Sequence, residues 1–262
     1  PTALRPFILG QFARSFNINC AEAEHPLTDY KSFNEFFTRG LRQEARLVDK
    51  TASLVSPVDG KVLEYAPIEE GTLIQAKGLD YRLEELVPTK DAEVFKNGQF
   101  MTIYLAPSDC HRIFSPIDGV VKKAISVPGH GYPVREPYIS EFKNLYTLNE
   151  RLVTVMDTAI GKVAMVMVAA TNVANVSAQY DRSLRTNLKG SKKVKVFNYN
   201  QPFKKGQWIN SFHLGSTVIL LTESRDYSFT IDKDAHITYG TGMTSKIKTC
   251  STDKSNQSCS CC

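Results

Sequence analysis

The sequence predicts an α+β protein, with a β-rich body of two similar antiparallel β units and amphipathic helices at the amino terminus. The body is indicated by short runs rich in Val, Ile, Thr and Tyr, which begin near residue 56 and are separated by Pro-Gly, Asp-Gly and Lys-Gly pairs. The helices are indicated by apolar residues that recur at helical spacing before residue 45. With 262 residues, 42% of them hydrophobic, the chain is long enough to bury a core.

Two amphipathic helices are predicted near the start of the chain. The first covers residues 4–16, where one face carries Leu4, Ile8, Phe12 and Phe16. The second begins at Ser32, because Ser32 and Glu35 have the spacing of a capping box. Its apolar face carries Phe33, Phe36, Phe37 and Leu41. Both faces fit either packing against the body or contact with lipid.

The predicted strands cover residues 61–66, 73–77, 100–105, 120–127, 152–157, 163–170, 217–222 and 228–231, with a hairpin turn at 159–161. One sequence repeat suggests that the body contains two similar units. Ser56-Pro57-Val58-Asp59-Gly60 is followed, 59 residues later, by Ser115-Pro116-Ile117-Asp118-Gly119. Turn chemistry alone accounts for both copies, so a role for either aspartate needs independent support.

The bulk composition limits the class of protein. The longest apolar run, 163–176, contains polar residues and is shorter than the ~20 residues of a transmembrane helix. The net charge of +5 fits an anionic membrane surface, or equally a solvated surface of mixed charge. We expect no nucleic-acid partner.

The cysteines do not predict a disulfide framework. Cys20 and Cys110 stand alone, and the other four, Cys250, Cys259, Cys261 and Cys262, lie in the last thirteen residues. We interpret residues 250–262 as a flexible Cys-rich tail and expect no metal site, although metal ligation or lipid attachment are alternatives for this tail.

Three residues could carry chemistry. Ser216 follows Gly215 directly before an apolar strand, so its hydroxyl is placed to attack the preceding carbonyl. His111 lies in a loop after a strand and could transfer protons near neutral pH. Asp59 could orient a histidine, as a carboxylate does in a hydrolytic triad. Each of these motifs is common in turns and loops when taken singly.

Taken together, the motifs and their order resemble the phosphatidylserine decarboxylase family over nearly the whole chain. The matching segments are Phe33-Asn34-Glu35-Phe36-Phe37-Thr38-Arg39, Ser56-Pro57-Val58-Asp59-Gly60, Ile74-Gln75-Ala76-Lys77-Gly78, Leu105-Ala106-Pro107-Ser108-Asp109-Cys110-His111-Arg112, Asn149-Glu150-Arg151, Val168-Ala169-Ala170-Thr171-Asn172-Val173 and Leu214-Gly215-Ser216-Thr217. Leu-Gly-Ser-Thr is weak evidence alone, whereas the ordered set is specific.

The resemblance implies a self-cleaving carboxy-lyase with a pyruvoyl cofactor made from Ser216. Ser216 would attack the Gly215 carbonyl, giving a β chain of residues 1–215 and an α chain of residues 216–262. The pyruvoyl group would form a Schiff base with the substrate amine and accept electrons as carbon dioxide leaves, without pyridoxal phosphate. By the same resemblance, His111 assists decarboxylation and Asp59 supports the cleavage.

The resemblance also implies an organisation and a location. Residues 1–45 would form a helical membrane-association segment and residues 46–249 the catalytic domain. The partners would be a phospholipid substrate, an anionic membrane surface and a second copy of the chain in a homodimer. The protein would be peripheral to a bacterial cytoplasmic membrane or an organellar inner membrane.

Two positions depart from the family pattern. Phe114 stands where the family usually has a second histidine that acts as the base of self-cleavage. Either His111 takes over beside Asp59, or another residue such as His130 or His213 approaches Ser216, or the chain matures poorly. The segment Tyr132-Pro133-Val134-Arg135 also differs, which leaves the head group open. The alternatives are therefore a soluble amino-acid decarboxylase of the same family and an unprocessed, non-catalytic lipid-binding relative.

Overall fold

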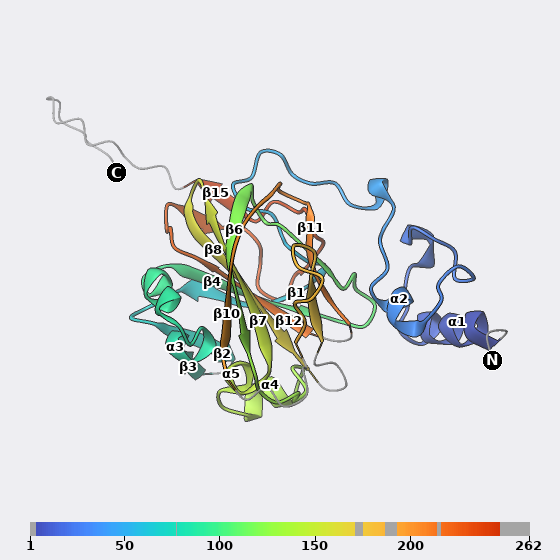
Figure 1. Ribbon diagram of the computed structural model, residues 1–262, viewed down its shortest axis with the longest axis horizontal. Coiled ribbons are helices and arrows are strands. Elements are labelled where there is room, and N and C mark those ends of the chain that lie inside the picture. The colour runs from blue at the N-terminus through green and yellow to red at the C-terminus, as the bar shows by residue number, and fades with distance from the viewer. Residues whose placement is uncertain (1–3, 77, 171–174, 187–192, 214–215, 247–262) are drawn as a thin grey trace, which may run out of the picture.

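An eight-stranded antiparallel sheet forms the centre of the molecule (Figure 1). In this computed structural model, residues 4–76, 78–170, 175–186, 193–213 and 216–246 are described. The strand order is β10-β6-β7-β8-β12-β4-β1-β14. In chain order these strands are β1 (Gly60–Pro67), β4 (Gln99–Leu105), β6 (Gly119–Val127), β7 (Arg151–Thr158), β8 (Gly161–Ala169), β10 (Lys195–Phe203), β12 (Ser216–Thr222) and β14 (His236–Ile237).

Smaller elements cover this sheet. A second sheet contains β5 (Arg112–Phe114), β11 (Trp208–Phe212) and β9 (Val176–Ala178), and two strand pairs are β2 (Thr72–Ala76) with β3 (Leu79–Arg82) and β13 (Tyr227–Phe229) with β15 (Thr244–Lys246). The helices are α1 (Arg5–Ser15), α2 (Phe33–Phe37), α3 (Leu83–Leu86), α4 (Tyr138–Glu141) and α5 (Leu145–Leu148), with 3-10 turns η2 (Cys20–Glu22), η3 (Gln43–Ala45) and η4 (Lys90–Phe95).

Both faces of the large sheet are buried. Side chains alternate between the faces along each strand, so Val218 and Leu220 of β12 join one apolar cluster and Ile219 and Leu221 join the other. The first cluster includes residues of β5, β9 and β11, and the second includes residues of β2, β3, α3, α4 and α5. Burial on both sides explains why β8 and β12 are continuous apolar runs in the sequence.

The two copies of the sequence repeat contact each other reciprocally. The Val55 N–H donates to the Pro116 carbonyl (3.0 Å), and the Phe114 N–H donates to the Pro57 carbonyl (2.8 Å). Donors and acceptors are related by the 59-residue offset of the repeat. The strand order is symmetric in the same way, because β14-β1-β4-β12 on one side corresponds to β10-β6-β7-β8 on the other. The predicted α+β fold with two similar antiparallel units is confirmed.

All the predicted strands are present within one or two residues of the expected bounds, and the hairpin at 159–161 joins β7 to β8. The short β3, β5, β9, β14 and β15 were not predicted, nor were β10 and β11. Strand β10 reads KVFNYNQPF, and its Asn, Gln and Pro residues obscure the β pattern. These residues are tolerated because β10 is an edge strand, which leaves one side of its backbone free of pairing in the sheet.

The amino-terminal segment forms a separate small cluster at one end of the molecule (Figure 1). The predicted cap at Ser32 is present, since the Glu35 N–H donates to Ser32 Oγ at 3.1 Å, while the Glu35 carboxylate accepts from the neighbouring Lys31 N–H and not from that of Ser32. Helix α2 is shorter than predicted, because it ends at Phe37 and Leu41 pairs in a β-bridge with Ala23. The described part of the chain contains no helix long and apolar enough to cross a membrane.

Helix α1 buries a different face from the one predicted. Leu9 and Ala13 are buried against Tyr30 and Phe36, whereas Leu4 and Ile8 are 53% and 56% exposed. Leu4, Ile8 and Phe16 of the predicted face therefore project into solvent, whereas Phe12 of that face packs on Phe33 with ring centroids 4.7 Å apart. Leu9 and Ala13 form a second apolar face that holds the helix to the protein.

Candidate active site

Asp59 is fixed by an arginine and a backbone amide in the turn before β1. Arg46 donates from Nη2 to Asp59 Oδ2 at 2.7 Å and from Nε to both carboxylate oxygens at 3.2 Å. The Tyr239 N–H donates to Asp59 Oδ1 at 2.8 Å. The carboxylate is 2% exposed, and the Arg46 charge compensates its burial. Among the described residues, Asp59 has no hydrogen bond to a histidine.

Phe114 is linked to this carboxylate through Tyr239. Its ring stacks on Tyr239, with ring centroids 3.7 Å apart and planes at 15°. Tyr239 is the residue whose N–H binds Asp59. Phe114 can exchange no proton, and burial, followed by the nearby Cys110 and Asp59, raises the pKa of the Tyr239 phenol to about 12, so this group stays protonated at neutral pH.

His111 is fully buried and held in one tautomer. Its Nδ1 lies 3.0 Å from the carbonyl oxygen of Asp109, and because a carbonyl only accepts, Nδ1 carries the proton. The Nε2 atom is therefore a lone-pair acceptor, and it has no hydrogen-bond partner in the described structure. Burial, and to a smaller extent the charge of Arg39, lower the pKa of His111 to about 3. The imidazole is neutral at physiological pH.

Two further residues support His111. Arg39 is buried and donates from Nη2 to the carbonyls of Ser108 (2.7 Å) and Asp109 (3.4 Å), so it shares an acceptor with His111. The Phe37 ring packs on the imidazole with centroids 4.0 Å apart. Helix α2 and the residues after it thus connect the amino-terminal segment directly to the candidate site.

The backbone of Ser216 begins β12, paired with Leu105 of β4 on one side and Ala169 of β8 on the other. Gly215 lies outside the described residues. The Phe212 N–H donates to the His111 carbonyl (2.9 Å), so His111 is joined to the segment that leads into Ser216. Asp59, His111 and the start of β12 thus lie in linked parts of the fold, but the two side chains contact different partners.

A second histidine near this segment has both ring nitrogens engaged. His213 Nδ1 lies 2.9 Å from Asn34 Oδ1, and His213 Nε2 lies 2.9 Å from Ser177 Oγ. The amide oxygen accepts from Nδ1, so Nε2 accepts from the serine hydroxyl. Burial, and next the nearby charge of Arg185, lower the pKa of His213. His130 differs from it, because His130 is exposed and its ring lies 5.0 Å from that of Tyr132.

Several of these residues were not predicted from the sequence. Arg46 and Tyr239 lie far from any recognisable motif, and only the fold brings them to Asp59. Arg39 ends the Phe33–Arg39 motif, but a basic residue after a helix is common, so the sequence does not indicate that this side chain is buried.

Comparison with known proteins shows which family has this arrangement. The family model described as phosphatidylserine decarboxylase matches residues 33–244, from the start of α2 into β15. The chain belongs to the phosphatidylserine decarboxylase family. This confirms the resemblance inferred from the sequence motifs.

Curated relatives of the phosphatidylserine decarboxylase family match most of the chain. A phosphatidylserine decarboxylase proenzyme of Myxococcus xanthus is 38% identical over 227 residues, which cover 86% of this chain and 81% of that protein. One from Psychromonas ingrahamii is 40% identical over 233 residues, with coverage of 86% and 81%. One from Pseudoalteromonas translucida is 42% identical over 221 residues, with coverage of 80% and 75%.

Proposed function

We propose that this chain is a proenzyme that cuts itself between Gly215 and Ser216 and then converts phosphatidylserine to phosphatidylethanolamine. The observation that carries the proposal is the family match, which spans Asp59, His111 and Ser216 in one fold. The two products of the cut would be a β chain, 1–215, and an α chain, 216–262. The reaction class is that of a carboxy-lyase.

The residues around the start of β12 fit a pyruvoyl group derived from Ser216. The buried, unpartnered Nε2 of His111 is the supporting observation, because an orphaned acceptor indicates that a further polar group belongs there. The pyruvoyl carbonyls would supply an electron sink for the bond that releases carbon dioxide. His111 and the backbone ends of β4 and β8 would surround that group.

Self-cleavage needs a base for the Ser216 hydroxyl, and His213 is the best-placed candidate. It precedes Gly215 by two residues, is neutral, and is oriented through Nδ1 by Asn34. In this proposal the Ser216 oxygen bonds to the Gly215 carbonyl carbon while its proton moves to His213 Nε2, once the Ser177 hydroxyl turns away. The proton then passes to the Ser216 nitrogen as the Gly215–Ser216 C–N bond breaks, which leaves an ester between the two residues. Asp59 has a supporting role, since its partners Arg46 and Tyr239 fix the turn before β1.

The neutral state of His111 suggests its part in decarboxylation. A substrate carboxylate beside the imidazole would raise its low pKa, because a nearby anion favours the protonated form, and Nε2 could then accept a proton from the substrate ammonium. His111 can then return that proton to the carbon that has lost its carboxylate. The imidazole is therefore neutral again at the end of each turnover.

The amino-terminal segment, residues 1–45, is proposed to hold the protein at a membrane surface. Leu4, Phe7 and Ile8 of this segment are each more than half exposed, and they lie on adjacent turns of α1. The protein would then be peripheral to a bacterial cytoplasmic or organellar inner membrane, and a homodimer is also proposed.

An assay with two substrates tests the proposal against its alternatives. Purified protein is incubated with phosphatidylserine in mixed micelles and, separately, with free serine, and the carbon dioxide released is measured beside a denaturing gel. We expect two fragments and turnover of the phospholipid. Turnover of free serine alone would favour the soluble amino-acid decarboxylase. A single uncut band without turnover would favour the non-catalytic relative suggested by Phe114.

A further inference from the structure

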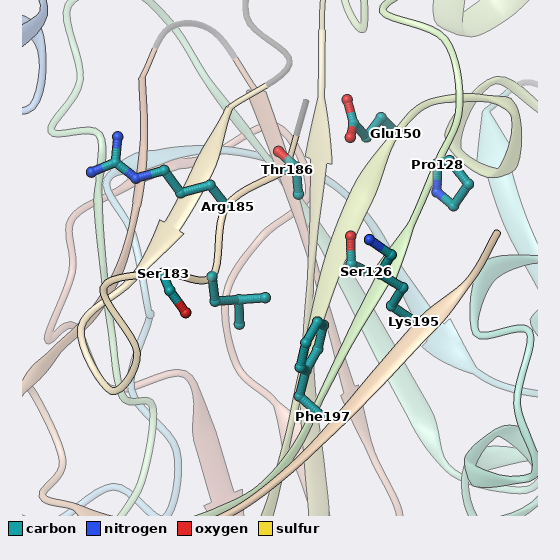
Figure 2. A pocket seen from close by; sticks show the side chains of 9 residues that line it. Ser126, Pro128, Glu150, Ser183, Arg185, Thr186, Lys195 and Phe197 are labelled. Carbon is teal, nitrogen blue, oxygen red and sulfur yellow. The ribbon is translucent and has the colours of Figure 1, made fainter. Parts of the chain in front are cut away.

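A small cavity opens at the β6–β10 edge of the large sheet (Figure 2). Its volume is about 240 Å³, and its walls include Ser126, Glu150, Leu184, Arg185, Lys195 and Phe197. Sites that enclose a whole small ligand typically have ~300–1,000 Å³. The cavity can therefore hold a head group while longer chains remain outside.

The charge in this cavity comes from the start of β10. Lys195 and Phe197 are two residues apart and so project from the same face of the strand, and Lys195 pairs with Ser126 of β6. Figure 2 shows the Lys195 ammonium beside Ser126, with Phe197 below it and Glu150 above. Among the described residues, neither Lys195 nor Arg185 forms an ion pair. With Glu150 included, the walls carry one net positive charge.

The cavity is joined to the candidate active site through short backbone connections. The Glu150 carbonyl accepts from the Ala169 N–H (2.9 Å), and Ala169 pairs with Ser216. Two strand spacings, roughly 10 Å, therefore separate Glu150 from the start of β12. On the other side Arg185 forms a β-bridge with Ser177, whose hydroxyl contacts His213.

Arg185 lies at the rim of the cavity. Figure 2 shows its guanidinium extending from the rim away from Lys195. Its charge is close enough to lower the pKa of His213, so it lies on the side of the cleavage segment. For one anion to contact both cations, the Arg185 side chain has to turn from this position back toward Lys195.

We infer that Lys195 and Arg185 form the subsite for the phosphodiester of the substrate, with Lys195 in the cavity and Arg185 at its rim. This inference rests on the proposed function. In a serine phospholipid, only the serine carbons and one ester oxygen separate the phosphate from the amine. A phosphate near Arg185 would therefore leave the amine directed to the start of β12, and the glycerol carbons could pack on Phe197 and Leu184.

The first test measures turnover of glycerophosphoserine, which carries the head group without acyl chains and so removes membrane binding from the result. Lys195→Gln and Arg185→Gln are each expected to raise KM roughly tenfold with little change in kcat, because each removes a charge-assisted contact to phosphate. Lys122→Gln is the matched control, since Lys122 lies on β6, binds Asn200 of β10 and does not line the cavity. Equal KM values for all variants would overturn the inference.

The second test measures binding without chemistry. In a Ser216→Ala background, which removes the nucleophile, glycerophosphoserine binding is measured by calorimetry with inorganic phosphate as competitor. We expect binding that phosphate weakens and that Lys195→Gln reduces roughly tenfold. Binding unaffected by Lys195→Gln and Arg185→Gln would contradict the subsite. The result does not depend on self-cleavage, so an uncut wild-type chain would overturn the proposed function and leave this test intact.

Discussion

At the scale of single residues, the two histidines of the candidate site have different surroundings. His111 is buried, neutral and held through Nδ1 by a carbonyl, which leaves Nε2 for a substrate. His213 is partly buried and lies beside the cleavage segment with a hydroxyl on Nε2. Different surroundings thus suit one imidazole to turnover and the other to maturation.

Replacement of His111 should separate turnover from maturation. His111→Gln is expected to cut itself normally and to lose decarboxylation by roughly 100-fold or more, the range that a general acid or base contributes. Fragment masses and carbon dioxide release measure the two steps. His130→Gln, a change at an exposed ring, serves as control. A His111→Gln enzyme with unchanged kcat would remove His111 from the mechanism.

Replacement of His213 should slow maturation. His213→Gln is expected to reduce the rate of self-cleavage by roughly 100-fold, because it removes the proton acceptor for Ser216. Burial, and next the charge of Arg185, hold the pKa of His213 below its ordinary value, so the wild-type rate should fall with decreasing pH only at a lower pH than an unperturbed imidazole would give, as the base becomes protonated.

Controls for His213 come from chemistry and from the family pattern. Added imidazole should restore cleavage to a His213→Gly variant, and Phe114→His should restore it in the His213→Gln background. Normal cleavage in His213→Gln would show that another group is the base. Because both rescues act on proton transfer, a variant that is merely misfolded would not respond.

At the scale of secondary structure, α1 has two apolar faces with different tasks. Leu9 and Ala13 hold the helix to the protein, and the exposed face is free to meet lipid. Leu4→Ser, Phe7→Ser and Ile8→Ser combined should reduce sedimentation with anionic liposomes by roughly tenfold or more, since buried apolar area drives such binding. Self-cleavage should be unchanged.

A matched control for α1 is Leu47→Ser, which removes a side chain that is 84% exposed but lies outside the helix. This variant should bind liposomes as the wild type does. If the triple variant also bound normally, another surface would have to contact the membrane.

The sequence predicted helix ends and turns well where they depend on a short local motif. The capping box at Ser32 and the Asp-Gly turns were predictable because they depend on neighbouring residues only. The contacts of Asp59 were not, because Arg46 and Tyr239 reach it through tertiary structure. The sequence also left open which apolar residues of α1 are buried, since they extend around much of the helix and only the packing partner decides which are covered.

At the scale of the whole molecule, two similar units carry equivalent turns with different environments. Asp59 and Asp118 each accept a backbone N–H, from Tyr239 and Lys205 respectively, at 2.8 and 2.7 Å. The Asp118 side chain is 59% exposed, whereas that of Asp59 is 2% exposed and paired with Arg46. Both units therefore contain the same turn, but only the aspartate of one copy, Asp59, is buried, which suits it to a specialised role.

This symmetry provides an internal control. Asp59→Asn should lower the free energy of unfolding by roughly 1–3 kcal/mol and impair self-cleavage, because Arg46 loses its buried charged partner and keeps only its ion pair with Glu22 at 2.9 Å. Asp118→Asn should change stability by less than about 1 kcal/mol and leave cleavage intact. Urea unfolding and fragment analysis measure both effects. Similar behaviour of the two variants would mean that Asp59 is only a turn residue.

Intact-mass measurement of the purified, active protein tests the whole account most directly. We expect two polypeptides, residues 1–215 and 216–262, with the second lighter than a serine-initiated fragment by one ammonia, as a pyruvoyl terminus requires. One continuous chain in a preparation that still decarboxylates phosphatidylserine would contradict self-cleavage and the origin of the cofactor together.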